Sequence, residues 1–277
     1  MPALSRPDGT QIHYEVHGDE GPPVVLATYW SWTPGVWAEL LADLATDHQV
    51  VTYHLRGTGE SSRNGPYEME ADSGDLEAVL EEVGGDAVLI SAADSANRAV
   101  KLGARRADLA PAVVTLGAGP FAVEMFEGQE GLLASASVLG AIVEMLERNY
   151  RGGMRTIMEA TNSQMSEDEL RERIDEQASF CDPDAAVDRL KAWVGDDPSQ
   201  ASRLLGDRLW ILTTPDVAGP WLPPWEVRKR LTDELMPEAR VVEFEADTGP
   251  VSQPHETADA LRRVSAPLRA GLAEERK

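Results

Sequence analysis

Short apolar runs alternate with amphipathic stretches along the first 120 residues. The apolar or alternating runs are typical of strands: Gln11–Val16, Val24–Ala27, Gln49–Leu55, Ala87–Ile90 and Ala112–Leu116. Between them, apolar residues recur at helical spacing over Trp37–Ala45, Glu68–Val83 and Ala96–Arg106. Strands that alternate with helices in this way predict an α/β fold with a mostly parallel sheet and right-handed crossovers.

The rhythm changes from Phe121 to about Leu205, where the pattern predicts helices without a strand between them: Leu132–Leu146, Met154–Met165, Glu167–Ala178 and Ala185–Val194. The alternation then resumes with strands at Leu209–Thr213 and Arg240–Glu245 and with helices at Glu226–Leu235 and from His255 onward. We therefore expect one α/β core, residues 1–120 and 206–277, with a helical cap at residues 121–205.

Charge narrows the classes of partner. The chain has 25 basic and 48 acidic residues, a formal net charge of -23. Such a polyanion repels nucleic acids and anionic membranes, so we expect neither as a partner. The excess of acidic residues is explained by solubility or, as a more specific alternative, by a preference for a cationic ligand. No apolar run is long enough to span a bilayer, and no signal peptide is evident, so the cytoplasm is the expected compartment.

Few residue types suited to metal or redox chemistry are present. The single cysteine, Cys181, excludes an internal disulfide and a cysteine-rich metal site. His13, His17 and His48 are expected at the surface. The histidines form no HExxH or other ligand motif, and Gly117-Ala118-Gly119 is a strand-end turn rather than a dinucleotide fingerprint. We expect no metal and no cofactor, and the sequence leaves the oligomeric state open.

One local motif carries a resemblance. Residues 55–61 read Leu-Arg-Gly-Thr-Gly-Glu-Ser, and His54 precedes them. This segment resembles the Asp-x-Arg-Gly-x-Gly-x-Ser turn of α/β-hydrolases, with His54 in place of the aspartate. Together with the order of elements, the resemblance implies an α/β-hydrolase fold with a mostly parallel eight-stranded sheet.

The catalytic positions that this resemblance implies depart from the family pattern. Residues 91–95, Ser-Ala-Ala-Asp-Ser, align with Gly-x-Ser-x-Gly, which places Ala93 at the nucleophile. Pro250 takes the position of the histidine, and Tyr29, after Thr28, takes the position of the oxyanion-loop glycine. Asp216 is near the position of the acid but has no histidine to orient. The sequence therefore predicts loss of the Ser-His-acid triad.

The loops at the strand ends are rich in aromatic residues, which predicts an aromatic-walled pocket at the carboxyl edge of the sheet. Ser95 is interpreted as a residue that caps or packs at the start of a helix, and it is the alternative nucleophile if Ala93 is excluded. Asp94 is interpreted as a cap or a hydrogen-bond acceptor. The predicted substrate-binding set is Thr28, Tyr29, Trp30, Trp32, Ala93, Asp94, Ser95, Phe126, Trp221 and Pro250.

The missing serine and histidine, with the length and fold pattern, make the chain similar to the peptide epimerases of bottromycin biosynthesis. That resemblance implies an isomerase that epimerises the α-carbon of an aspartate beside a thiazoline in a macrocyclic peptide, with the substrate's own carboxylate as the base. Two alternatives stay open. One is a hydrolase with a displaced nucleophile at Ser95, Asp94 or Asp216, and the other is a non-catalytic protein that binds a small molecule.

Overall fold

A computed structural model describes residues 2–122, 125, 136–161, 165–215, 223–244 and 253–275. Its eight strands form one sheet in the order β1-β2-β4-β3-β5-β6-β7-β8. The strands are β1 (Ala3–Ser5), β2 (Gln11–His17), β3 (Pro23–Ala27), β4 (Gln49–Tyr53), β5 (Val88–Ala92), β6 (Ala112–Leu116), β7 (Leu209–Thr213) and β8 (Arg240–Glu243). The pairs β1–β2 and β2–β4 are antiparallel, and the other neighbouring strands run parallel. The mostly parallel sheet predicted from the alternating pattern is confirmed.

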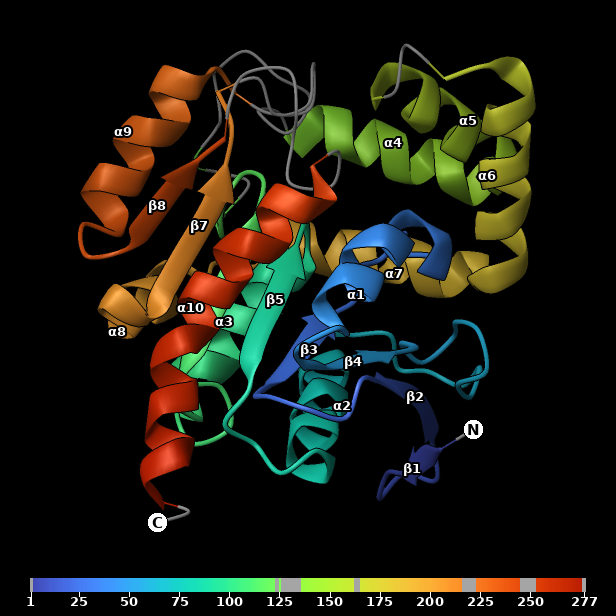
Figure 1. Cartoon of the computed structure of the whole chain (residues 1–277). Helices are drawn as coiled ribbons and strands as arrows, with labels where there is room; N and C mark the ends of the chain where they lie inside the picture. The colour runs from blue at the N-terminus through green and yellow to red at the C-terminus, as the bar shows by residue number, and fades with distance from the viewer. Residues whose placement is uncertain are drawn as a thin grey trace.

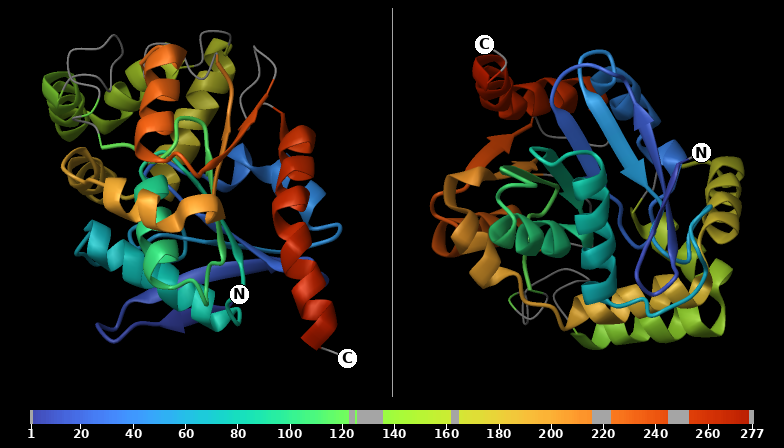
Figure 2. Two further views of the ribbon diagram at one scale, coloured as in Figure 1. Left: turned by 90° about the vertical axis from the view of Figure 1, so that its left-hand side faces the viewer. Right: turned by 90° about the horizontal axis from the view of Figure 1, so that it is seen from below.

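Helices cover both faces of the sheet, because successive strand residues point to opposite sides. Val24 and Val50 pack with residues of α1 (Ala38–Leu44) and α10 (Pro254–Glu275). Val25 and Val51 pack on the other face, with residues of α2 (Met69–Glu82), α3 (Ser95–Arg105), α8 (Ser199–Leu205) and α9 (Trp225–Leu235). Figure 2 shows these two helical layers on either side of the strands.

Four further helices lie between β6 and β7 in the chain: α4 (Ala136–Arg148), α5 (Tyr150–Thr161), α6 (Glu167–Phe180) and α7 (Pro183–Val194). A Ser166–Glu169 capping box begins α6, and Asp182 caps α7 ahead of Pro183. Figure 1 shows α4, α5 and α6 beyond the carboxyl ends of the parallel strands. This is where a cap over a ligand site would lie, and the division into core and cap at residues 121–205 stays a prediction.

Candidate functional site

The turn between β5 and α3 holds Ala93 in a left-handed conformation. Its φ is 49°, β5 ends one residue before it, and α3 begins two residues after it. For a residue with a Cβ this conformation costs about 1–2 kcal/mol, so the surrounding structure must enforce it. The Ala93 side chain is exposed although its neighbours on both sides are partly or fully buried. The apex of the turn thus presents a methyl group to the surface.

Ser95 is committed to holding this turn. It is fully buried, and its hydroxyl donates to the Ala92 carbonyl at 2.7 Å and accepts from the Ala92 N–H at 3.0 Å. Both bonds return to the end of β5, which fastens the first residue of α3 onto the strand. The Ser95 hydroxyl thus uses its donor and one acceptor position within the turn itself.

Asp94 connects the turn to the loop after β3. One carboxylate oxygen accepts the backbone N–H of Trp30 at 2.9 Å, and the other accepts from Arg98 Nη1 at 2.6 Å. Arg98 also donates to the Thr28 carbonyl at 2.7 Å. Burial lowers the pKa of the Arg98 guanidinium, but the carboxylates of Asp94 and Asp72 outweigh this effect and keep the pKa above its usual range.

The role of Arg98 was not predicted from the sequence, although its spacing from Asp94 could have indicated it. Asp94 and Arg98 stand four residues apart at the start of the predicted helix, the spacing at which opposite charges meet on one helical face. Full burial of both side chains is what the pattern does not reveal, because an acid and an arginine at a helix start are ordinarily exposed.

The aromatic residues of the loop after β3 lie in different surroundings. Trp30 and Trp32 are buried and belong to the two core clusters, and the Trp32 ring packs edge-on against Phe180 of α6. Tyr29 is partly exposed as a residue, and its hydroxyl accepts from Trp37 Nε1 at 3.3 Å. Burial of the hydroxyl raises the pKa of Tyr29 to about 12, which keeps it neutral.

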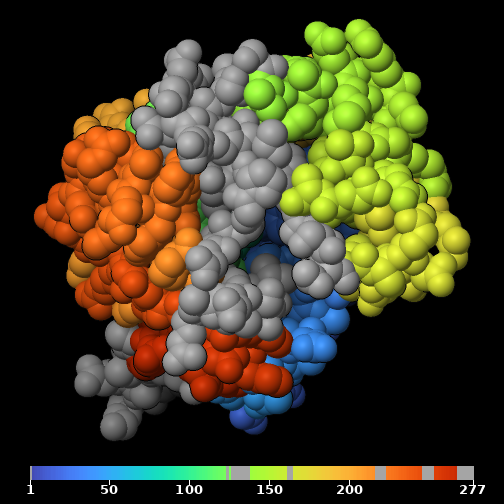
Figure 3. Space-filling view, turned by 90° about the horizontal axis from the view of Figure 1, so that it is seen from above, coloured from blue at the N-terminus to red at the C-terminus, as the bar shows by residue number. Residues whose placement is uncertain are grey.

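Small residues line the edge of the sheet beside Ala93. Ala92 and the strand-end turn Gly117-Ala118-Gly119 are all partly exposed there. Figure 3, which looks down on this end of the molecule, shows a few blue and green atoms at depth between α9 and the helices α4–α6. Asp216, Trp221, Pro250 and Phe126 lie outside the described residues, and the predicted pocket set as a whole stays a prediction.

On the far side of this edge, α9 packs against β7 and β8. Arg228 is buried there, its guanidinium donates to the carbonyls of Pro215 and Pro223, and it lies 5.1 Å from the centre of the Trp225 ring. A cavity of about 20 Å³ beside it has room for one water molecule. Arg228 therefore fastens the two described ends of the loop between β7 and α9.

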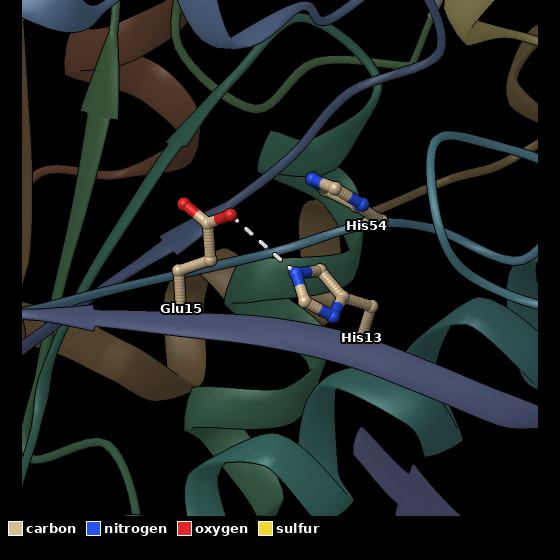
Figure 4. Close-up of side chains that lie close together, drawn as sticks. All are labelled: His13, Glu15 and His54. Atoms are coloured by element: carbon tan, nitrogen blue, oxygen red, sulfur yellow. Dashed lines mark hydrogen bonds and ion pairs between the residues drawn. The ribbon is translucent and has the colours of Figure 1, made fainter. Parts of the chain in front are cut away.

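Three possible metal ligands meet at the start of the sheet, contrary to the expectation of scattered surface histidines. His13, Glu15 and His54 place one ligand atom each within 4.8 Å of the others (Figure 4). However, the Glu60 N–H donates to His54 Nδ1 at 3.0 Å, which leaves the proton of the neutral ring on Nε2. Burial lowers the pKa of His54 to about 4. A ring held in this tautomer has no lone pair to offer, so the cluster is poorly suited to a metal.

A Ser-His-Asp arrangement does exist in the chain, away from the β5–α3 turn. His48 bonds Asp47 through Nδ1 at 2.9 Å and Ser265 through Nε2 at 2.7 Å. His48 and Ser265 are fully buried, where the loop before β4 meets α10. The prediction that His13 and His48 lie at the surface was thus wrong, because tertiary packing buries both side chains. The hydrogen bond from His48 to Ser265 ties α10 to the loop before β4.

No family model matches the chain. The protein assigned as carbamate hydrolase RutD of Azorhizobium caulinodans is 35% identical over 74 residues, which are 26% of this chain and 28% of the relative. The match thus spans little more than a quarter of that relative's length.

Solved structures match over nearly the whole chain. The bromoperoxidase of Bacillus anthracis is 20% identical with a TM-score of 0.74, covering 92% of this chain and 95% of its own. The enol-lactonase of Burkholderia xenovorans is 21% identical with a TM-score of 0.69, covering 96% and 99%. An alpha/beta hydrolase of Sphaerobacter thermophilus is 24% identical, with a TM-score of 0.69 and 95% and 99% coverage. This chain has the α/β-hydrolase fold.

The comparisons correct the expected reaction. Carbamate hydrolase and enol-lactonase are names of hydrolases, and they contradict the isomerase that the resemblance to bottromycin epimerases implied. The expectation of an isomerase failed because that resemblance rested on absent residues: alanine stands at position 93 instead of a serine, and proline at position 250 instead of a histidine. A missing nucleophile excludes one chemistry but selects no other.

Every helix within the described residues is too short or too polar to cross a bilayer.

Proposed function

We propose that this α/β-hydrolase-fold protein binds a small organic molecule at the carboxyl edge of β3, β5 and β6 without serine hydrolysis. The observation that carries the proposal is the hydrogen bond in which the Asp94 carboxylate accepts from the Trp30 N–H. In the hydrolase pattern the backbone N–H groups of this loop stabilise the oxyanion of the reaction. Here a side chain of the protein already takes that donor.

The remaining parts of a serine hydrolase also fail to meet at this turn. Hydrolysis needs a nucleophile and a base within hydrogen-bond reach of each other. Ala93 supplies only a methyl group at the apex, and the Ser95 hydroxyl is held by both polar groups of Ala92. The predicted histidine position, Pro250, carries no base. These observations support loss of the triad, while the small side chains at this edge of the sheet leave room for a ligand to approach.

The chemistry of the surroundings favours a compact, uncharged or cationic ligand. Ala93, Ala118 and Gly119 present little side-chain bulk, so a ligand can approach the backbone of the turn closely. The formal net charge of -23 disfavours polyanions at long range.

A hydrolase with a displaced nucleophile is the second candidate, because the comparisons favour hydrolases. Asp94 could act as a nucleophile only if it lost its hydrogen bonds from Trp30 and Arg98. Ser95 could do so only if its hydroxyl lost its bond to the Ala92 carbonyl. Asp216 lies outside the described residues. The two candidates therefore differ in a measurable way: one needs a reactive side chain, and the other needs only a shaped hollow.

The test combines a covalent probe with a binding measurement. We expect no label from a fluorophosphonate, judged by intact mass, and no turnover of p-nitrophenyl esters, lactones or carbamates. An Ala93→Ser variant should remain inactive, because no base is in place. In a thermal-shift panel of neutral esters, lactones and amines, hits should disappear in Ala93→Phe, which adds a ring at the apex of the turn, and persist in Leu204→Phe, which places the same ring at a 66% exposed position.

Label on the wild type, mapped by peptide mass to a serine, or turnover lost on replacing one acid, would establish the hydrolase instead. Hits that persist in Ala93→Phe would move the binding site away from this turn.

A further inference from the structure

The Asp94 carboxylate is bound as an external carboxylate ligand would be. Its two oxygens go to two different donors, a backbone N–H and a guanidinium, at 2.9 and 2.6 Å. Asp94 and Arg98 are fully inaccessible to solvent, and Trp30 is 7% exposed. Charge-assisted bonds of this kind are roughly twice as strong as neutral ones, and burial strengthens them further.

The two donors do not depend on Asp94 for their own placement. Arg98 is held by its bond to the Thr28 carbonyl and lies 3.8 Å from Asp72 of α2. Trp30 packs in the core, and its carbonyl is approached by the Cys181 thiol at 3.8 Å. Arg98 Nε is buried without a hydrogen-bond partner among the described residues, so the guanidinium has donor capacity to spare.

We propose that the Trp30 N–H and the Arg98 guanidinium form a carboxylate-binding site that the chain fills with its own Asp94. Asp94 is then the specificity-determining residue of the ligand site, an inference that rests on the proposed binding function. A ligand that brings a carboxylate or a developing oxyanion to Trp30 must displace Asp94 and leave that carboxylate buried without partners. The wild-type site therefore rejects such ligands.

The substitution Asp94→Ala tests this site with a simple probe. Alanine keeps the Cβ and deletes only the carboxylate group, so the atoms removed correspond to formate. The variant leaves Arg98 Nη1 and the Trp30 N–H without their carboxylate acceptor around a space of that shape. Formate should enter it and stabilise the fold by binding the native state alone.

The measurement is the unfolding temperature in sodium formate against sodium chloride at equal ionic strength. For Asp94→Ala we expect a saturable rise of about 5–10 °C at a formate concentration about 100 times the dissociation constant. The wild type should show no formate-specific rise. Asp94→Asn is the matched control: it removes the same charge but fills the space, so formate should not stabilise it.

A double variant, Asp94→Ala with Arg98→Met, should lose the formate effect because the guanidinium is gone. If Asp94→Ala does not fold alone, the readout becomes tryptophan fluorescence during refolding with formate or chloride. Equal behaviour in the two salts, under either readout, would overturn the proposal, and so would an equal formate response in Asp94→Asn. The assay uses neither turnover nor the unknown ligand, so its failure is distinguishable from failure of the proposed binding function.

Discussion

A buried ion pair joins the helical segment to the α/β core, and breaking it should be costly. Arg189 of α7 donates to both carboxylate oxygens of Asp72 on α2, at 2.6 and 2.9 Å, and to the Arg56 carbonyl at 2.6 Å. Both charged side chains are at most 1% exposed. The substitution Arg189→Met keeps most of the aliphatic volume but leaves Asp72 without its bidentate partner.

Removal of one member of a buried pair costs about 3–5 kcal/mol, because the other charge stays desolvated. Since about 1 kcal/mol lowers the unfolding temperature of a protein of this size by roughly 2–4 °C, the variant should unfold about 6–20 °C lower. Urea unfolding, followed by circular dichroism and by tryptophan fluorescence, measures the free energy directly.

Two controls make the result specific. Arg171→Met breaks an ion pair with Asp168 in which both side chains are well exposed, and it should cost less than about 0.5 kcal/mol. Adding Asp72→Leu to Arg189→Met should cost less than the sum of the single changes, because the buried Asp72 charge, which Arg98 approaches only at 3.8 Å, is then gone. A loss below about 1 kcal/mol for Arg189→Met, or strict additivity of the pair, would refute the reasoning.

Three further outcomes are expected. Because burial lowers the pKa of His54 to about 4, its contribution to stability is complete above pH 6.5 and is lost as the pH falls toward 4; His54→Gln should flatten that part of the pH–stability curve. Gly59→Ala, at a residue whose φ is 48°, would place a Cβ against the His54 ring and 2.8 Å from the Phe180 ring, and should cost at least about 2 kcal/mol in urea unfolding. Ser265→Ala removes the bond to His48 and should cost about 1–2 kcal/mol while leaving fluorophosphonate reactivity unchanged.

The fold could be predicted because its evidence is periodic. The strand at residues 112–116 and the helices at 183–194 and 225–235 lie within two residues of the predicted bounds, since an apolar run or stripe at one spacing admits one element. Two short elements, β1 and α8, escaped. A strand of three residues and a helix of seven carry too few apolar positions for a period to be recognised.

The candidate site was harder to predict because its contacts join distant segments. Asp94 meets Trp30 across 64 positions, and His48 meets Ser265 across 217. Nothing in the pattern around an aspartate or a histidine announces such a partner. Inference from the family motif pointed to Ala93 at the turn, but the bond from the Trp30 N–H to the Asp94 carboxylate became evident only from the packed structure.

The exposed alanine at the β5–α3 turn makes the centre of the candidate site chemically addressable. Ala93→Cys would place a thiol at the N-terminus of α3, where the helix dipole lowers a thiol pKa. The chain's own cysteine, Cys181, is buried, and burial raises its pKa to about 11, so it reacts slowly. A fluorophore or spin label could therefore be attached at one selected atom of the exposed turn and would report what binds beside it.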